Sequence, residues 1–277
     1  MTVTKLFHGQ LVTVEEIGHP PEEPHRDPPE EFEEEDSINF VERGTFHLRL
    51  GGELILLSPE RLLLARRNLP LRFRHAEGVP TDVCTSVRFH EASLTQELGD
   101  RKTTVVPLTN RLTYLRWRLH RFTEEGRDPI DVESVAGDLV AALATRDPAP
   151  RRRLGEVRLV RYARLVERAR ELMSARYSER ISLQLIARDA GLSPFHFARI
   201  FRELEGTPPH RYLSGVRLRR AARLLREGAS VTEACFASGF ENLSHFIRMF
   251  SRRFGATPSR FTGKRAESAR GHSSPRD

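Results

Sequence analysis

The first part of the chain consists of short apolar segments separated by turn residues. Glycine and proline pairs such as Gly51-Gly52 and Ser58-Pro59 end one segment and precede the next. Short runs of apolar and β-branched residues between such turns are typical of β-strands. Six segments fit this description: Ser37–Val41, Thr45–Leu50, Glu53–Leu57, Arg61–Ala65, Leu71–His75 and Cys84–Phe89. Their close spacing predicts a small β-sandwich or barrel.

The hydrophobic period then changes to that of a helix. In Leu108–Phe122 and in Val132–Leu143 apolar residues recur every third or fourth position, which predicts two amphipathic helices. Leu112 and Leu119 lie on the apolar stripe of the first helix. Two arrangements bury such stripes: the helices cover an open face of the barrel, or they form a seam with a second copy of the chain. The sequence does not decide between them.

Two proline-containing segments interrupt these patterns. Residues 20–36 are rich in proline and acid and predict a solvated loop or a disordered arm. The segment Asp147–Pro150, followed by three arginines, ends the helical pattern and predicts an interdomain linker. We therefore expect one domain over residues 1–150 and a second over residues 151–277, each long enough to bury its own core.

The second domain contains an internal repeat. Residues 182–206, SLQLIARDAGLSPFHFARIFRELEG, recur as residues 230–255, SVTEACFASGFENLSHFIRMFSRRFG. Arg199 matches Arg248 at a spacing of 49 residues. Each copy predicts a short helix, a turn that contains glycine and a longer helix, which is the helix-turn-helix arrangement.

Capping residues in each copy support this assignment. Serines stand where N-caps are expected and glycines where a left-handed residue ends a short helix: Ser182, Ser193 and Ser230, and Gly191 and Gly239. Ser230 with Glu233 has the pattern of a capping box, and Pro194 suits the first position of the longer helix. Two capped units in register predict the helix-turn-helix arrangement far more strongly than one.

The longer helices have an inner apolar face and an outer face. The inward residues are Phe197, Ile200, Phe201 and Leu204 in the first copy and Phe246, Met249 and Phe250 in the second. The outward residues are Phe195, Ala198, Arg199 and Arg202 in the first copy and Ser244, Ile247, Arg248 and Ser251 in the second. Small side chains beside an outward arginine suit a helix that presents a guanidinium to guanine in the major groove. An ordinary solvated arginine is the alternative for a lone helix, and the repeat favours DNA binding.

A helix that begins at Pro208-Pro209 connects the two copies. It is rich in arginine, and we expect Arg217 among these residues to contact DNA. Cys235 occupies the place of Ala187 on the short helix and is expected to be a small core residue. His196 and His245 lie one on each longer helix, so we interpret them as structural or phosphate-facing and not as metal ligands.

The charge distribution separates the two halves. The net charge is +7, and residues 151–277 carry about +15, which leaves about −8 for residues 1–150. A basic domain joined to an acidic one suggests that the basic domain binds a polyanion, with an arginine-rich compositional bias as the alternative. Two cysteines far apart, Cys84 and Cys235, give neither a disulfide framework nor a zinc site. Without an apolar membrane segment or a signal peptide, we expect a cytoplasmic protein.

The second half of the sequence resembles the AraC/XylS family of bacterial transcription regulators. The similarity runs from about Leu165 to Phe261 and includes GLSPFHFARIFRELEG, RLRRAARLLREG and ASGFENLSHFIRMFSRRFGATPSRF. The resemblance implies a seven-helix domain whose two helix-turn-helix units enter successive major grooves, with Arg199 and Arg248 reading bases. The chain departs from the family at Phe195, where tryptophan is common, and at Leu243, where polar residues are common.

The first half is similar to the cupin-like sensor domain of many members, chiefly through INFVERGTFHLRLGG. A metal-binding cupin has an H-x-H pair with a downstream glutamate, and no such set surrounds His47 or His75. The resemblance therefore implies a sensor or dimerisation domain without catalysis. The expected fold class is α+β: an N-terminal cupin-like barrel or sandwich with two helices, then an all-α domain with two helix-turn-helix units.

Together these patterns predict a sequence-specific DNA-binding transcription regulator that is not an enzyme and needs no metal or cofactor. The expected partners are double-stranded DNA, RNA polymerase, a small-molecule effector at a site we do not assign, and a second copy bound through the first domain. The expected DNA contacts are Phe195, Ala198, Arg199, Arg202, Arg217, Ser244, Ile247 and Arg248. The alternatives are a cupin-type enzyme with an appended DNA-binding domain, and an architectural DNA protein. A repair methyltransferase needs a Pro-Cys-His-type motif, which Asp82-Val83-Cys84-Thr85 lacks.

Overall fold

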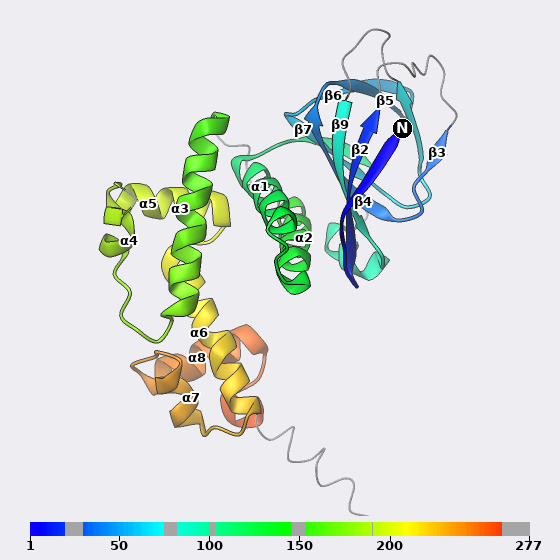
Figure 1. Ribbon diagram of the computed structural model, residues 1–277. Coiled ribbons are helices and arrows are strands. Elements are labelled where there is room, and N and C mark those ends of the chain that lie inside the picture. The colour runs from blue at the N-terminus through cyan, green and yellow to red at the C-terminus, as the bar shows by residue number, and fades with distance from the viewer. Residues whose placement is uncertain (20–29, 75–81, 100–102, 146–152, 190, 262–277) are drawn as a thin grey trace, which may run out of the picture. The chain divides into compact units, whose positions relative to one another are not determined.

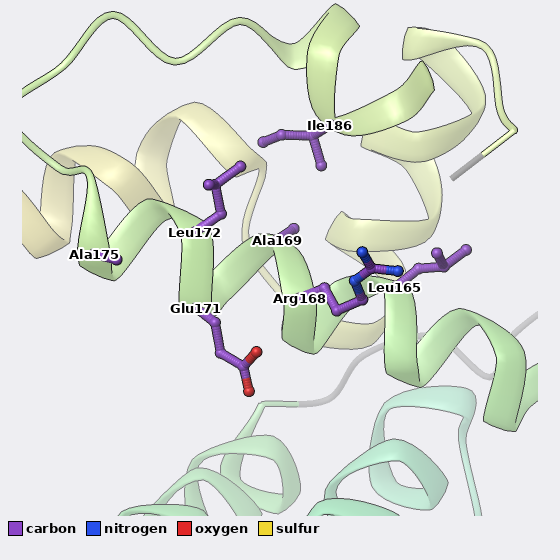
Figure 2. A pocket seen from close by; sticks show the side chains of 7 residues that line it. All are labelled: Leu165, Arg168, Ala169, Glu171, Leu172, Ala175 and Ile186. Carbon is purple, nitrogen blue, oxygen red and sulfur yellow. The ribbon is translucent and has the colours of Figure 1, made fainter. Parts of the chain in front are cut away.

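The computed structural model describes residues 1–19, 30–74, 82–99, 103–145, 153–189 and 191–261 (Figure 1). Contacts within the chain divide it into two units, Met1–Ala163 and Arg164–Asp277. The predicted linker at Asp147–Pro150 lies outside the described residues. The expected functional boundary at residue 150 therefore stays a prediction.

The first unit is built on two antiparallel sheets. In the six-stranded sheet the order is β1 (Thr2–His8), β2 (Val12–His19), β9 (Asp82–Phe89), β4 (Asp36–Arg43), β7 (Arg61–Ala65) and β10 (Thr104–Pro107). In the four-stranded sheet the order is β3 (Glu31–Phe32), β8 (Pro70–Arg74), β5 (Phe46–Leu50) and β6 (Glu53–Leu57). Figure 1 shows these strands at the N-terminal, blue to cyan end of the chain.

The two sheets share an apolar core. Val41 and Leu63 come from the six-stranded sheet, and Leu48 and Leu71 come from the four-stranded one, yet all four belong to one buried cluster. Alternate residues of each strand point to the same side, so one face of each sheet supplies this cluster. Of the two arrangements expected from the strand pattern, a sandwich or a barrel, the structure shows two antiparallel sheets that share a core.

The predicted strands agree with the observed ones. Glu53–Leu57 and Arg61–Ala65 have the predicted bounds, and the others differ by one or two residues at an end, with His75 outside the described residues. Four strands were missed: β1, β2, β3 and β10. β1 and β2 have several charged, glycine and histidine residues among their β-branched ones, so their apolar signal is weak, and pairing with β9 through β2 stabilises them.

The expected loop at residues 20–36 needs a correction at its end. Residues 20–29 lie outside the described residues, but Glu31–Phe32 pairs with β8 and Asp36 begins β4. The buried carboxylate of Asp36 accepts hydrogen bonds from the backbone N–H of Arg67 (2.8 Å) and from the hydroxyl of Thr95, and it pairs with Arg66. An acidic residue that looked solvated is thus an internal anchor, because buried charges persist where such partners satisfy them.

The two helices that follow the sheets are α1 (Asn110–Glu124) and α2 (Pro129–Ala144), and η1 (Ala92–Leu98) is a short 3₁₀ segment before them. Figure 1 shows α1 and α2 side by side. Leu112 and Leu119 are buried within this unit. The apolar stripe is therefore part of the unit's interior and is not an open seam for a second copy.

The second unit is all helical. Its helices are α3 (Glu156–Ala175), which crosses the division between the units, α4 (Leu183–Asp189), α5 (Pro194–Glu205), α6 (Pro209–Arg226), α7 (Val231–Ala237) and α8 (Leu243–Phe254). A further helical segment begins at Pro258 and continues to Phe261, where the described residues end. None of the described helices is long and apolar enough to cross a membrane.

Candidate nucleic-acid interface

The first helix-turn-helix unit consists of α4, a glycine turn and α5. The hydroxyl of Ser182 accepts a hydrogen bond from the backbone N–H of Gln184 (3.2 Å), and that of Ser193 accepts one from His196 (3.3 Å). Gly191 has φ +63°, the left-handed conformation that ends α4 without a Cβ clash. Pro194 occupies the first turn of α5. The caps predicted for this unit are confirmed.

The second unit repeats this arrangement with α7 and α8. Ser230 and Glu233 form both hydrogen bonds of the capping box, at 3.2 and 2.8 Å. Gly239 is left-handed with φ +86°. The cap of α8 was not predicted: Asn242 Oδ1 accepts a hydrogen bond from the backbone N–H of His245 (2.8 Å). Asn242 lies 49 residues after Ser193, the spacing that also relates Arg199 to Arg248, so an asparagine takes the place of the serine cap of the first copy.

The inner faces of α5 and α8 are fixed by aromatic packing. Phe197 and Phe201 are buried with their ring centroids 5.8 Å apart, and Phe246 and Phe250 are buried with theirs 5.5 Å apart. Phe246 and Phe250 join a core formed with α6 and α7 that includes Cys235. The expectation that Cys235 is a small core residue is confirmed. Because the inner faces are locked in this way, the rotation of each helix about its axis, and thus its outer face, is set.

The outer face of α5 carries an exposed aromatic ring beside two exposed arginines. Phe195 is 90% exposed, and Arg199 and Arg202 are exposed, whereas Ala198 is half-buried between them. A phenylalanine held this far out in water contributes nothing to the protein core. The ring of Phe195 and the guanidinium groups of Arg199 and Arg202 are therefore exposed together on this face of α5.

The outer face of α8 differs from the expectation in two places. Ser244 and Arg248 are exposed as predicted. Ile247 is half-buried and packs against the core of α6 to α8, and so does Leu243. Ser251 is half-buried, and its hydroxyl is buried and has no hydrogen-bond partner among the described residues. The outward face of α8 is therefore narrower than that of α5 and is centred on Ser244 and Arg248.

The arginines at the repeated position are free of acidic partners. No ion pair within the described part of the second unit uses Arg199 or Arg248, whereas Arg170, Arg180 and Arg223 are each paired with a glutamate. An exposed guanidinium without a carboxylate keeps its full charge and its five N–H donors for a ligand. Helices α5 and α8 thus each present one arginine at the same repeat position.

Arg217 lies in a different environment from the other predicted DNA contacts. It is half-buried on α6, and its Nε and Nη2 atoms donate hydrogen bonds to the backbone carbonyls of Tyr177 (2.7 Å) and Glu179 (2.9 Å). Burial lowers the pKa of its guanidinium, and the charge of Glu241 opposes that change. Two of its nitrogen atoms are thus used inside the protein, which the sequence pattern did not indicate.

His196 on α5 and His245 on α8 lie in different surroundings. The His245 ring lies edge-on to Phe240 with the centroids 6.3 Å apart, and His196 is half-buried. Within the residues that the structure describes, no three histidine, cysteine or acidic side chains gather to form a metal site.

Comparison with known proteins places these elements in a family. A family model described as a helix-turn-helix domain matches residues 186–264. The HTH-type transcriptional regulator GlxA of Rhizobium meliloti (strain 1021) is 43% identical over 74 residues, which cover 26% of this chain and 23% of GlxA. The probable transcription factor PqrA of Proteus vulgaris is 33% identical over 85 residues, which cover 30% of this chain and 70% of PqrA.

A solved structure is also similar to part of this chain. The crystal structure of a probable AraC family transcriptional regulator from Rhodopseudomonas palustris CGA009 is 30% identical, with a TM-score of 0.35, and the match covers 36% of this chain and 96% of that one. The chain spans less than a quarter of the length of GlxA and 70% of the length of PqrA. The family model matches residues 186–264, which lie in the helical unit.

The second unit is a tandem helix-turn-helix DNA-binding domain, defined by its two capped repeats and by the matching family model. The chain belongs to the AraC/XylS family of bacterial transcription regulators.

Proposed function

We propose that this chain regulates transcription by binding a specific DNA sequence through α5 and α8, which enter successive major grooves. One observation carries the proposal: Arg199 and Arg248 occupy the same position in two capped repeats, and both are exposed without an acidic partner. A guanidinium in this position can form two parallel hydrogen bonds to O6 and N7 of guanine. Phosphate contacts supply most of the affinity, and these arginines supply the base specificity.

The neighbouring side chains have separate roles in this proposal. Ala198 and Ser244 are small, so they let each helix approach the base edges closely. Phe195 contacts the methyl group of a thymine, which is an apolar contact that an exposed ring can make. Arg202 lies one turn after Ala198 and contacts the phosphate backbone. Ile247 supports the helix from its half-buried position and adds an apolar edge to the contact surface.

The first unit is proposed to control when the DNA-binding unit is available. Its two sheets around one core suit a cupin-like sensor or dimerisation domain, and its acidic charge sets it apart from the basic half. A small-molecule effector, RNA polymerase and a second copy of the chain are the partners proposed here, with a cytoplasmic location. Pairing with a second copy must use a surface other than Leu112 and Leu119, because both are buried.

The other function considered from the sequence was a cupin-type enzyme with an appended DNA-binding domain. No observation favours it, since the paired histidines that a metal-dependent cupin uses are missing around His47. We therefore propose regulation of transcription as the function of the chain and no enzymatic activity.

The test is selection of DNA by the full-length protein from a pool of random duplexes, followed by affinity measurements on the recovered sequence and on a shuffled duplex of equal length. A regulator is expected to bind the recovered sequence at least on the order of 1,000-fold more tightly than the shuffled one at physiological salt. Equal affinity for both would identify an architectural protein without sequence preference and would refute the proposal.

A further inference from the structure

The segment between α3 and α4, residues 176–182, is held to the middle of α6 by one side chain. Arg217 donates from Nε to the carbonyl of Tyr177 over 2.7 Å and from Nη2 to the carbonyl of Glu179 over 2.9 Å. A guanidinium is planar, so two hydrogen bonds from one such group fix both the distance and the direction of the main chain that accepts them. Hydrogen bonds from a charged donor are also about twice as strong as neutral ones.

A second contact on α6 holds the side chain of the same segment. The guanidinium carbon of Arg220 lies 5.9 Å from the centroid of the Tyr177 ring. Arg220 follows Arg217 by three residues, so both side chains leave the same side of the helix. The main chain and the aromatic ring of Tyr177 are therefore both fastened to α6.

The segment also packs directly on the turn of the second helix-turn-helix unit. A Cβ atom placed on Gly239 would lie 2.7 Å from Cα of Ser178 and 2.9 Å from the carbonyl oxygen of Tyr177. These distances are shorter than real Cβ contacts, so the glycine turn and the segment touch backbone to backbone. The ion pair between Arg180 and Glu241 (2.7 Å) joins the same two places but is exposed, and such pairs contribute little.

The segment thus leads from α3 into the first helix-turn-helix unit while it rests on the second. Helix α4, with which that helix-turn-helix unit starts, begins at Leu183, four residues after Glu179. The turn that contains Gly239 leads into α8. Any loosening of residues 176–182 therefore changes the position of the first helix-turn-helix unit relative to the second helix-turn-helix unit.

We propose that Arg217 is a positioning residue, which fixes the separation and orientation of α5 and α8 by holding residues 176–182 to α6 and against Gly239. The inference rests on the proposed function, since it requires both helices to bind DNA. When the two helices are rigidly spaced, binding of one brings the other to its subsite at a high effective concentration. Without the hydrogen bonds from Arg217, each helix keeps its own contacts with DNA. The gain in affinity from binding both subsites at once becomes smaller.

The test compares how strongly different variants depend on subsite spacing. The full-length wild type, Arg217→Met, Arg217→Lys and the control Arg223→Met are measured on a duplex that the wild type recovered from random DNA. Each is also measured on the same duplex with one base pair inserted between the two subsites, and with one subsite randomised. Arg223 suits as a control because it lies on α6 but pairs with Glu227 and not with the segment.

The quantity compared is the ratio of the affinity for the intact duplex to the affinity for the altered duplex. Substitution of Arg217 is expected to change this ratio and not only the affinities. The wild type and Arg223→Met are expected to lose on the order of 100-fold on insertion or on randomising one subsite. Arg217→Met is expected to lose less than about 10-fold, and Arg217→Lys, which keeps the charge but has a single donor nitrogen, to lie between. A role in stability alone lowers affinity for all three duplexes equally and leaves the ratio unchanged.

Two failures are distinguishable. If the wild type shows no preference for the intact duplex, binding through two subsites is wrong and so is the proposed function. If the wild type shows the preference and folded Arg217→Met retains the full ratio, Arg217 does not position the helices. Should Arg217→Met not fold, Arg217→Lys decides: a wild-type ratio for that variant overturns the inference, and a reduced ratio supports it.

Discussion

Arg170 on α3 donates a hydrogen bond from Nε to the hydroxyl of Tyr212 on α6 over 3.1 Å, and its guanidinium carbon lies 5.4 Å from the centroid of that ring. Its Nη1 atom also pairs with Glu167 at 2.9 Å, and Nε lies 3.6 Å from Glu205 at the end of α5. All of these charged groups are at most 15% exposed. One buried cation therefore joins three helices of the DNA-binding domain.

Replacing Arg170 with alanine is expected to destabilise the helical unit by about 3 kcal/mol, because it removes a buried cation that contacts two buried carboxylates. Arg223→Ala removes an exposed i,i+4 pair with Glu227 and is expected to change stability by less than about 0.5 kcal/mol. Urea unfolding followed by far-ultraviolet circular dichroism measures both. Trp117, the only tryptophan of the chain, lies on α1 in the first unit, so its fluorescence transition should not change. Equal effects of the two substitutions would contradict the role of Arg170.

Gly239 allows a sharper test of backbone packing, because Gly255 is a matched control. Both are left-handed, with φ of +86° and +68°, but a Cβ on Gly255 meets nothing within 4 Å. Gly255→Ala is expected to cost about 1 kcal/mol from backbone strain alone. Gly239→Ala adds the clash with Ser178 and is expected to cost at least about 1 kcal/mol more. Thermal unfolding of the two variants measures the difference, and equal costs would show that the close approach is absent in solution.

Glu42 on β4 links the sheet to α1 through His120, whose Nε2 lies 3.0 Å from Oε1 of the carboxylate. Burial alone would raise the pKa of Glu42, but the hydrogen bond from His120 and the charge of Arg116 outweigh it and hold the pKa below its usual value. A carboxyl whose pKa is lower in the folded state stabilises the fold above its unfolded pKa. That stabilisation is lost as the pH falls below about 4.5 and through the folded value.

We therefore expect Glu42→Gln to destabilise the first unit at pH 7 and to have a much smaller effect at pH 3. Trp117 fluorescence during urea unfolding at both pH values measures this change. Glu124→Gln, at an exposed position of α1, is the control and should have little effect at either pH. A Glu42→Gln effect that is the same at pH 7 and pH 3 would show that the carboxylate charge is not what binds α1 to the sheet.

The charge of the second half predicts a steep dependence of DNA binding on salt. Residues 151–277 carry about +15, and each phosphate neutralised releases counterions, so the logarithm of the affinity falls linearly with the logarithm of salt concentration. Alanine at Arg202, proposed as a phosphate contact, should reduce the slope by about 1 and weaken binding to all sequences alike. Affinity that does not change between low and moderate salt would contradict binding to the phosphate backbone.

Much of the helical unit could be predicted from the sequence because its signals are local. Ser230 and Glu233, Gly191 and Pro194 act on their own helix, so the pattern of residues specifies the cap. The inner faces followed from helical spacing for the same reason. Asn242 was missed because an asparagine stands where the first copy has its serine cap, so the two caps do not match by residue type.

Features that depend on distant parts of the chain could not be predicted in this way. Arg217 resembles other helix-surface arginines in sequence, and only the fold brings the carbonyls of residues 177 and 179 to it. Asp36 ends an acidic segment, yet its buried carboxylate accepts hydrogen bonds from Arg67 and Thr95, which are far away in the sequence. Ile247 has outward spacing, but the neighbouring core covers part of it. The unpredicted strands β1 and β2 likewise depend on pairing with β9.

Arg199 and Arg248 are proposed to read bases in two successive grooves. The test measures the affinity of the wild type, Arg199→Ala and Arg248→Ala for the selected duplex and for every single-base substitution of it. Each variant is expected to lose about 1–3 kcal/mol on the selected duplex and to lose discrimination at one base pair, with the two base pairs roughly 10 apart. Uniform weakening on every duplex, with discrimination unchanged, would show that these arginines contact phosphates and would contradict the account.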